Sequence, residues 1–219
     1  VIASWDSLRS RAERRARGIP AELGDAYYQL VLHPIEAVAN LHELYFAVAR
    51  NRAWAQQGRV GTNRLADSAR LLFERDAEIS RRFHTIGGGK WNHMMAQTHI
   101  GYTYWQEPPR NVMPRVDVIQ VPVPAEMGVA FEGQVPFAVP GQGPPPGGPV
   151  RPREPALPEF DAYQRQSYYI DVYNRGQTPF AFTATAAEPW VVISPASGTV
   201  EKQQRVMVSI DWNRVPNGR

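Results

Sequence analysis

The sequence predicts an α+β protein in two segregated parts, an N-terminal helical bundle followed by an immunoglobulin-like antiparallel β-sandwich. Three observations predict this: helical spacing of apolar residues up to about residue 110, two-residue alternation from Arg115 onward, and a Pro- and Gly-rich stretch between the strands. About six strands are expected where such a sandwich has about seven, so the sandwich is expected to be truncated. The expected domains are a helical bundle over 1–110, a first β segment over 111–135, a linker or insertion over 136–158 and sandwich strands over 159–219.

Composition excludes several classes of protein. The 219 residues are 43% hydrophobic and 11% aromatic, which excludes a disordered chain. Cysteine is absent, and this excludes disulfide scaffolds, cysteine-ligated zinc, iron–sulfur clusters and thiol catalysis. The net charge of +3 is too small to indicate a nucleic-acid partner. No apolar run is long enough to span a membrane and the N-terminus has no signal-peptide pattern. The chain begins without Met, which suggests a processed protein or a fragment.

Helices are expected in the first 90 residues. A short polar helix carries the arginines between Arg9 and Arg17, which are expected to form a solvated face. A long amphipathic helix over 25–57 is expected to bend or restart at Pro34 and to end at Gly58 and Gly61. Thr62 is expected to cap the next helix, which ends at residues 87–89 and packs antiparallel to the first. The expected core of this hairpin comprises Leu41, Leu44, Tyr45, Val48, Leu65, Leu72, Phe73 and Ile79.

Strands are expected after the helices. Alternating apolar residues predict them over 115–121, 168–173, 179–186, 189–193 and 205–212, with turns at 174–176 and at Ser197-Gly198. Residues 136–158 contain nine Pro and four Gly and are expected to form an extended linker or insertion.

Three motifs lack the surroundings that their chemistry needs. The run 87–90 (GGGK) precedes Trp91 and follows a helix, whereas a phosphate loop needs Ser or Thr after the lysine and a strand before it. His33, Glu36, His42 and Glu43 offer no identifiable third metal ligand, so no metal site and no cofactor are expected. Spacing on helices does not identify a glycosidase pair among Glu36, Glu43, Glu74 and Glu107.

Residues 91–105 are the part of the chain whose composition points to function. They supply aromatic rings for stacking on the C–H face of a sugar (Trp91, Tyr102, Tyr104, Trp105) and polar groups for hydroxyl contacts (Asn92, His93, Gln97, His99). The alternative is that Met94, Met95, Ile100 and Trp105 belong to the core and that the histidines are structural hydrogen-bonding groups. Residue chemistry alone leaves both interpretations open.

Longer motifs resemble a known family. These are residues 33–45 (HPIEAVANLHELY), 89–102 (GKWNHMMAQTHIGY) and 105–114 (WQEPPRNVMP), with 188–190 (EPW) and 194–200 (SPASGTV) in the β part. The sequence resembles the C-terminal half of glycoside hydrolase family 115, the xylan α-1,2-glucuronidases. These enzymes release glucuronic acid or its 4-O-methyl ether from xylan side chains.

The resemblance implies an accessory role without catalytic residues in this chain. In the family, the catalytic carboxylates lie on a preceding barrel domain, and the helical domain helps to close the pocket and forms dimer contacts. It implies substrate-binding positions at Trp91, Asn92, His93 and Met94. Tyr102 and Trp105 join them as stacking candidates from residue chemistry. Arg110 and Asn111 are weaker candidates, and Ala96 stands where the family carries an acidic residue.

The expected partners follow from the same resemblance. They are the upstream barrel domain of the same polypeptide, xylan or glucuronoxylo-oligosaccharides, and a second copy in a homodimer, with no nucleic acid and no membrane. The full-length protein is expected to be periplasmic or secreted. The alternative is a stand-alone carbohydrate-binding or protein-interaction module.

Overall fold

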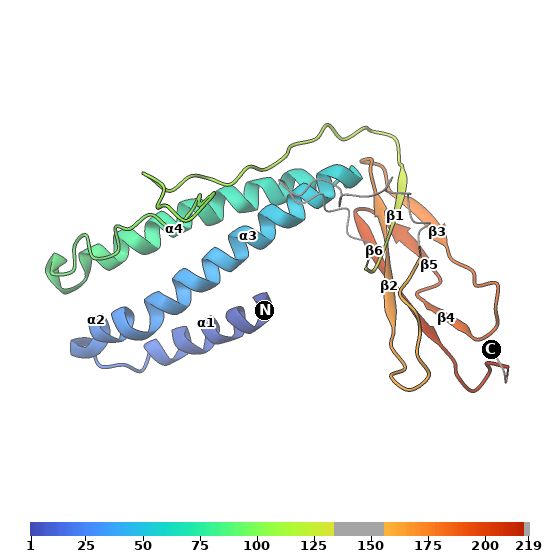
Figure 1. The fold of residues 1–219 in the computed structure, drawn as a ribbon, viewed down its shortest axis with the longest axis horizontal. Coiled ribbons are helices and arrows are strands. Elements are labelled where there is room, and N and C mark those ends of the chain that lie inside the picture. Colours follow the sequence, from blue (N-terminus) through green and yellow to red (C-terminus); the bar gives the residue numbers. More distant parts are fainter. Residues whose placement is uncertain (134–155, 217–219) are drawn as a thin grey trace. The chain divides into compact units, whose positions relative to one another are not determined.

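The structure, a computed structural model, describes residues 1–133 and 156–216. It confirms the segregated α+β class, with helices over residues 2–89 and antiparallel strands over residues 127–210 (Figure 1). The chain forms two compact units, a helical unit (residues 1–52 and 63–118) and a β unit (residues 53–62 and 119–219). The predicted linker over 136–158 lies almost wholly outside the described residues.

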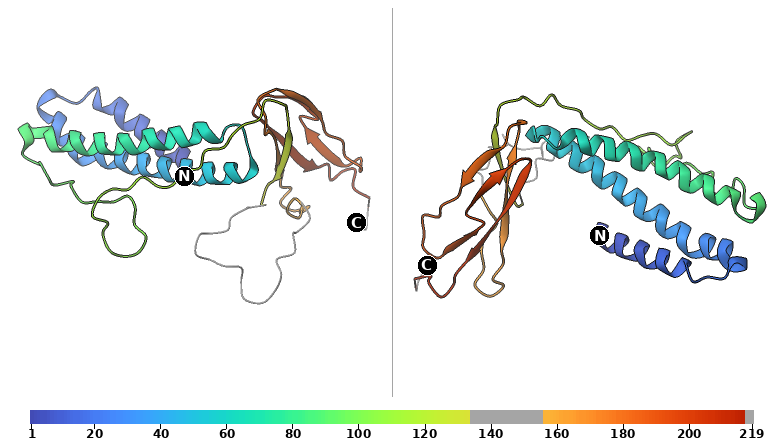
Figure 2. Two further views of the ribbon diagram at one scale, coloured as in Figure 1. Left: turned by 90° about the horizontal axis from the view of Figure 1, so that it is seen from above. Right: turned by 180° about the vertical axis from the view of Figure 1, so that it is seen from behind.

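Three long helices and three short ones make up the N-terminal part. α1 (Ile2–Ala16) is followed by a short 3₁₀ turn η1 (Ala21–Leu23), α2 (Gly24–Tyr27) and a π-helical turn η2 (Tyr28–Leu32). α3 (His33–Gln57) and α4 (Thr62–Gly89) then form an antiparallel pair, and α1 runs beside α3 (Figure 1, Figure 2). The expected interruption at Pro34 thus takes the form of a π turn. None of the helices in the described ranges is long and apolar enough to cross a membrane.

The helix ends follow their local sequence. α4 begins at Thr62 itself, and the Thr62 hydroxyl donates a hydrogen bond to the Arg59 carbonyl, whereas an N-cap oxygen accepts one from the first turn of the helix. Regular helix ends before Gly87 and Gly88, whose φ angles of 59° and 64° lie in the left-handed region that glycine adopts without strain. In α1 the arginines are exposed except Arg9, which pairs with Asp6 and Glu43.

Two apolar clusters form the core of the helical unit. One contains Ala12, Tyr28, Leu32, Phe83 and Ile86, and the other contains Leu44, Ala47, Val48, Ala69 and Ile100. The expected placement of Tyr45 in the core is wrong, because 43% of this residue is exposed. Leu44 is fully buried, and Tyr45, the next residue along the helix, is rotated by about 100° out of the core-facing stripe.

Residues 91–118 return beside α4 without regular secondary structure (Figure 2). Ile100, Met113 and Val116 pack against the second cluster. The Asn51 amide forms a two-way pair with the backbone of Asp117, with N···O distances of 2.9 and 2.8 Å. The expected strand over 115–121 is therefore wrong: Val116 packs on helices, and a side chain rather than a neighbouring strand bonds the backbone beside it.

The β unit contains two antiparallel sheets. The first has the order β1 (Met127–Phe131), β2 (Tyr168–Asn174), β6 (Gln203–Ile210) and β4 (Val191–Ser194). The second pairs β3 (Phe180–Thr183) with β5 (Ser197–Val200). Val172 and Val206 of the first sheet pack against Phe182 and Val200 of the second. This arrangement confirms the predicted sandwich.

One expected turn of the β unit is wrong. Ser197 and Gly198 lie inside β5, where they pair with Thr183 and Phe182. The change of direction occurs earlier, at residues 195–196, where a proline supplies the corner. Gly198 packs closely instead, because a Cβ atom there would lie 3.2 Å from the Phe182 ring, a tight contact.

A buried arginine holds the loop between α3 and α4 on the first sheet. The Arg59 guanidinium stacks on the Tyr173 ring at 4.1 Å and lies 5.1 Å from the Trp54 ring. It also reaches Asp171 at 3.4 Å and Gln203 at 3.2 Å. The loop of residues 53–62 is thus part of the β unit through a cation that is 4% exposed.

The first prediction tests the hairpin core. Leu44→Ala should lower the free energy of unfolding by about 2–5 kcal/mol, because Leu44 is fully buried and the change leaves a cavity. Leu71→Ala is the matched control, since Leu71 is 66% exposed, and it should change the free energy by less than about 0.5 kcal/mol. Urea unfolding followed by circular dichroism measures both, and equal midpoints would contradict the helix register.

The second prediction concerns Arg59. Arg59→Met should destabilise the β unit by about 3 kcal/mol, because it removes one partner of a buried ion pair and leaves Asp171 with Arg205 alone. Arg70→Met removes an exposed pair with Asp67 and should change stability by less than about 1 kcal/mol. Thermal unfolding of both variants measures this difference, and a small effect at Arg59 would mean that packing alone holds the loop.

Candidate functional site

A pocket of about 390 Å³ lies in the helical unit beside the aromatic segment. Three parts of the chain form its walls: α3, α4 and the loop after α4. Its lining residues are His33 and Ala37 on α3, Asp76, Ile79 and Ser80 on α4, and Met94, Met95, Gln97, Thr98, His99 and Tyr102 on the loop. The helical residues recur at three- and four-residue spacings, which place them on one face of each helix.

Two of the six predicted substrate-binding residues line this pocket. Met94 is 65% exposed and Tyr102 is 45% exposed, so both side chains can reach a bound molecule. Gln97 and His99, which the sequence suggested for polar contacts, line the pocket as well.

The other four predicted residues lie elsewhere. Trp91 is partly buried against the first core cluster and carries Lys90 Nζ 5.0 Å from its ring centroid. The Asn92 side chain accepts a hydrogen bond from the His93 backbone, and His93 adopts a positive φ of 67°. Trp105 is 85% exposed. The structure does not bring these four residues together with Met94 and Tyr102 as one wall.

His99 is fixed at both ring nitrogens. Nε2 lies 3.0 and 2.9 Å from the two carboxylate oxygens of Asp76, and Nδ1 lies 3.0 Å from the Gln97 carbonyl. Both partners are acceptors, so both nitrogens need a proton and the imidazolium form fits this position best. The hydrogen bond to Asp76 raises the pKa of His99 above its usual range, although burial opposes the rise.

Asn111 holds the backbone on which His99 is placed. Its side-chain oxygen accepts hydrogen bonds from the backbone N–H groups of His99 and Ile100, at 2.8 and 3.0 Å. Asn111 thus positions the loop that carries the pocket wall, and it is absent from the lining itself.

His33 stands across the pocket in a different electrostatic state. It is buried against the rings of Phe83 and Tyr28, with ring centroids 4.5 and 5.9 Å apart. Burial lowers the pKa of His33, and the neighbouring His84 lowers it further. The pocket therefore has on one wall an imidazole whose pKa is lowered and on the other an imidazole whose pKa is raised.

The combination of Ser80, His99 and Asp76 does not form a nucleophilic triad. Such a triad needs one histidine nitrogen on the carboxylate and the other on the serine, whereas the second nitrogen of His99 faces the Gln97 carbonyl. Among residues 1–133 and 156–216, no group of three or more His, Asp or Glu side chains could hold a metal ion. The geometry fits binding of a polar, ring-containing molecule.

Asp76 is not among the predicted site residues, although the sequence carries a signal for it. Asp76 lies four residues after Leu72 and three before Ile79, in the apolar stripe of α4, and is 4% exposed. A carboxylate in a core-facing stripe must be paired, so it predicts a buried partner. That partner could not be named from the sequence, because it depends on the path of the loop.

The third prediction concerns pH. The folded-state pKa of His99 is raised, so its stabilising contribution is fully present below the unfolded value of about 6.5 and is lost as pH rises through the folded value. The loss of unfolding free energy caused by His99→Gln should therefore be larger at pH 6 than at pH 8.5. Urea unfolding at both pH values measures this difference. A loss that does not depend on pH would contradict the imidazolium assignment.

No protein-family model matches this chain, and no curated protein matches it. The family resemblance therefore rests on the sequence motifs, and the candidate site rests on the geometry of the pocket.

Proposed function

We propose that the chain is the C-terminal accessory part of a xylan α-1,2-glucuronidase, in which the pocket beside Tyr102 and Met94 forms one wall of the substrate site. The observation that carries the proposal is this pocket: an exposed ring and two methionines stand next to a fixed imidazolium, on the segment whose motif resembles family 115. The loop residues that line the pocket, between Met94 and Tyr102, all lie within the motif over 89–102.

The lining has the two kinds of group that a sugar ring needs. Tyr102, Met94 and Met95 offer apolar surface for the C–H face of the ring. The amide of Gln97 can donate to and accept from hydroxyl groups. His99 adds a positive charge close to any bound uronate, although Asp76 beside it offsets much of that charge. We therefore expect positioning and modest electrostatic attraction from this wall.

Bond cleavage is assigned to the partner domain. Both protons of the His99 imidazolium are directed at Asp76 and Gln97, so the residue has no free proton to transfer to a glycosidic oxygen. The proposal follows the resemblance in placing the catalytic carboxylates on an upstream barrel domain, in a periplasmic or secreted homodimeric enzyme. In this scheme the present chain acts on the binding of the substrate side chain.

A second candidate function has an observation of its own. Trp105 is 85% exposed and Tyr104 is 61% exposed, on the loop that follows the pocket residues. Flat exposed rings of this kind suit a stand-alone carbohydrate-binding module that stacks on a polysaccharide. The two candidates differ in which aromatic residue matters, Tyr102 for the pocket and Trp105 for the exposed loop.

The fourth prediction tests this difference. The ligand is a xylotriose that carries one 4-O-methylglucuronic acid side chain, and calorimetry measures its binding to the chain. Tyr102→Ala should weaken binding about tenfold, a change of about 1.4 kcal/mol. Tyr45→Ala is the matched control, since Tyr45 is exposed to nearly the same fraction, 43% against 45%, and lies outside the pocket. Trp105→Ala should leave binding unchanged.

The same variants have an expected effect on activity. In the full-length enzyme, Tyr102→Ala should lower kcat/KM on glucuronoxylan fragments at least tenfold, which corresponds to about 1.4 kcal/mol. The isolated chain should release no glucuronic acid. Loss of binding in Trp105→Ala but not in Tyr102→Ala would favour the stand-alone module, and hydrolysis by the isolated chain would refute the accessory role.

A further inference from the structure

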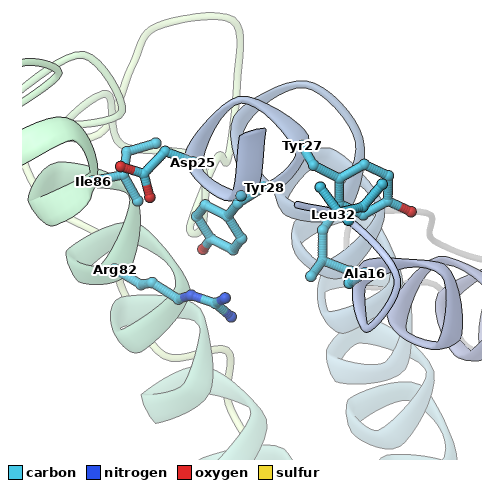
Figure 3. Close-up of a pocket in the computed structure, with 9 residues that line it drawn as sticks. Ala16, Asp25, Tyr27, Tyr28, Leu32, Arg82 and Ile86 are labelled. Atoms are coloured by element: carbon cyan, nitrogen blue, oxygen red, sulfur yellow. The ribbon is translucent and has the colours of Figure 1, made fainter. Parts of the chain in front are cut away.

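A second cavity lies in the helical unit at the corner where the chain passes from α1 into α3 (Figure 3). It has a volume of about 280 Å³ and is formed by α1, the η1–η2 corner and the last turns of α4. Its walls combine apolar side chains with two opposite charges. The apolar residues are Ala16, Ile19, Leu32 and Ile86, and the charged ones are Asp25 and Arg82.

Arg82 lines this cavity and stacks its guanidinium on a ring of the cavity wall, with 55% of its side chain exposed. The guanidinium carbon lies 3.9 Å from the centroid of the Tyr28 ring, and Tyr28 is itself only 4% exposed. The stacking keeps the planar fork in place. The nearest carboxylate oxygen in its ion pair, Glu36 Oε2, is 3.8 Å away, which is too long for a hydrogen bond. Within the described residues the Arg82 N–H groups make no hydrogen bond, so they remain available to a ligand carboxylate.

Asp25 supplies the opposite charge. Its Oδ2 accepts a hydrogen bond from the Gly87 backbone N–H at 2.8 Å, which ties the corner to the end of α4. Its Oδ1 has no partner among the residues that the structure describes. In the view of Figure 3, Asp25 lies beside Ile86, and the Arg82 guanidinium lies below the Tyr28 ring. The cavity therefore offers an anion site at Arg82 and a cation site at Asp25, and apolar side chains share its lining.

The backbone that forms this corner is unusual. Tyr28 and Leu32, the first and last residues of the π turn η2, both line the cavity. π turns occur mostly as single turns inside α-helices and are frequent at functional sites. The volume lies just below the range of about 300–1,000 Å³ that is typical of small-molecule pockets, which limits the ligand to the size of one ring.

We propose that this cavity binds a small zwitterion with an apolar body, whose carboxylate pairs with Arg82 and whose ammonium group pairs with Asp25. A bidentate contact between guanidinium and carboxylate would fix one end of the molecule. Leu32 and Ile86 would cover the middle, where the hydroxyl groups of a sugar would be left without partners. The site is thus distinct in chemistry from the pocket beside Tyr102 and does not depend on its proposed function.

The test uses 4-(aminomethyl)benzoate as the probe, with two molecules that each lack one charge. Benzoate lacks the ammonium group and benzylamine lacks the carboxylate. Calorimetry and ¹⁵N-resolved chemical shifts of the whole chain measure binding at millimolar concentrations. The zwitterion should bind at least about tenfold more tightly than either single-charge molecule. Its binding should change the chemical shifts of Tyr28, Leu32 and Ile86. Free glucuronate should cause no shifts there.

Paired variants assign the two ends of the probe. Arg82→Gln should weaken the binding of the zwitterion and of benzoate about tenfold. Arg81→Gln removes the same charge from the neighbouring position and should change the affinity for neither molecule. Asp25→Asn keeps an acceptor for the Gly87 N–H. It should weaken the binding of the zwitterion and of benzylamine but not that of benzoate, with Glu22→Gln as its control. Thermal unfolding shows whether each variant is folded.

A cavity-filling variant keeps the test decisive if Arg82→Gln does not fold. Ala16→Leu leaves both charges in place and should abolish binding of the zwitterion by occupying the cavity. The proposal is overturned if wild-type protein gives no saturable shifts at Tyr28 and Ile86. It is also overturned if Ala16→Leu binds as tightly as wild type, or if benzoate binds as tightly as the zwitterion.

Discussion

The candidate site depends on how the irregular segment 91–118 satisfies its backbone. A chain that lies along a helical hairpin without forming a strand has no regular partners for its N–H and C=O groups, and buried groups of this kind must be paired. Asn51 pairs with Asp117 in both directions, and Asn111 accepts from two consecutive N–H groups. Together with His99 on Asp76, these side chains hold the loop in the place that secondary structure would otherwise fix.

In the β unit, the irregular loop of residues 53–62 is likewise held by a side chain, the buried guanidinium of Arg59. Arg59 lies between two aromatic rings and is paired with Asp171, while Arg205 holds the other oxygen of the same carboxylate at 3.0 Å. Tyr173 can lie flat in this stack because Gly128 stands opposite it, and a Cβ atom there would come within 2.2 Å of the ring. Arginine has no acceptor nitrogen, so all of its side-chain contacts here are made as a donor, unlike the ring nitrogens of His99, whose donor or acceptor role depends on protonation.

The sequence predicted the helices and strands that periodic apolar residues mark, and it missed the features that depend on contacts between distant parts of the chain. The apolar stripes that contain Leu44 in α3 and Leu72 in α4 predicted the two long helices, and two-residue alternation predicted the strands that pair with other strands. Val116 alternates in the same way, yet it packs on helices, since period alone does not say whether a neighbouring strand exists. In the site, composition singled out Tyr102 and the family resemblance singled out Met94, but the side-chain directions of Trp91 and His93 depend on the turn at residues 87–93. The path of that turn decides which side chains of the segment line the pocket and which pack in the core.

The π turn η2 acts as a one-residue insertion in the helix that leads into α3. One residue corresponds to about 100° of rotation, so the helix before the turn and the helix after it present faces that a continuous α-helix could not present together. A relative that lacked this residue would keep the face of α3 that carries His33 and Ala37 but would rotate Tyr28 away from Arg82. The length of this turn, more than the identity of any side chain in it, would then distinguish proteins that have the corner cavity from those that do not.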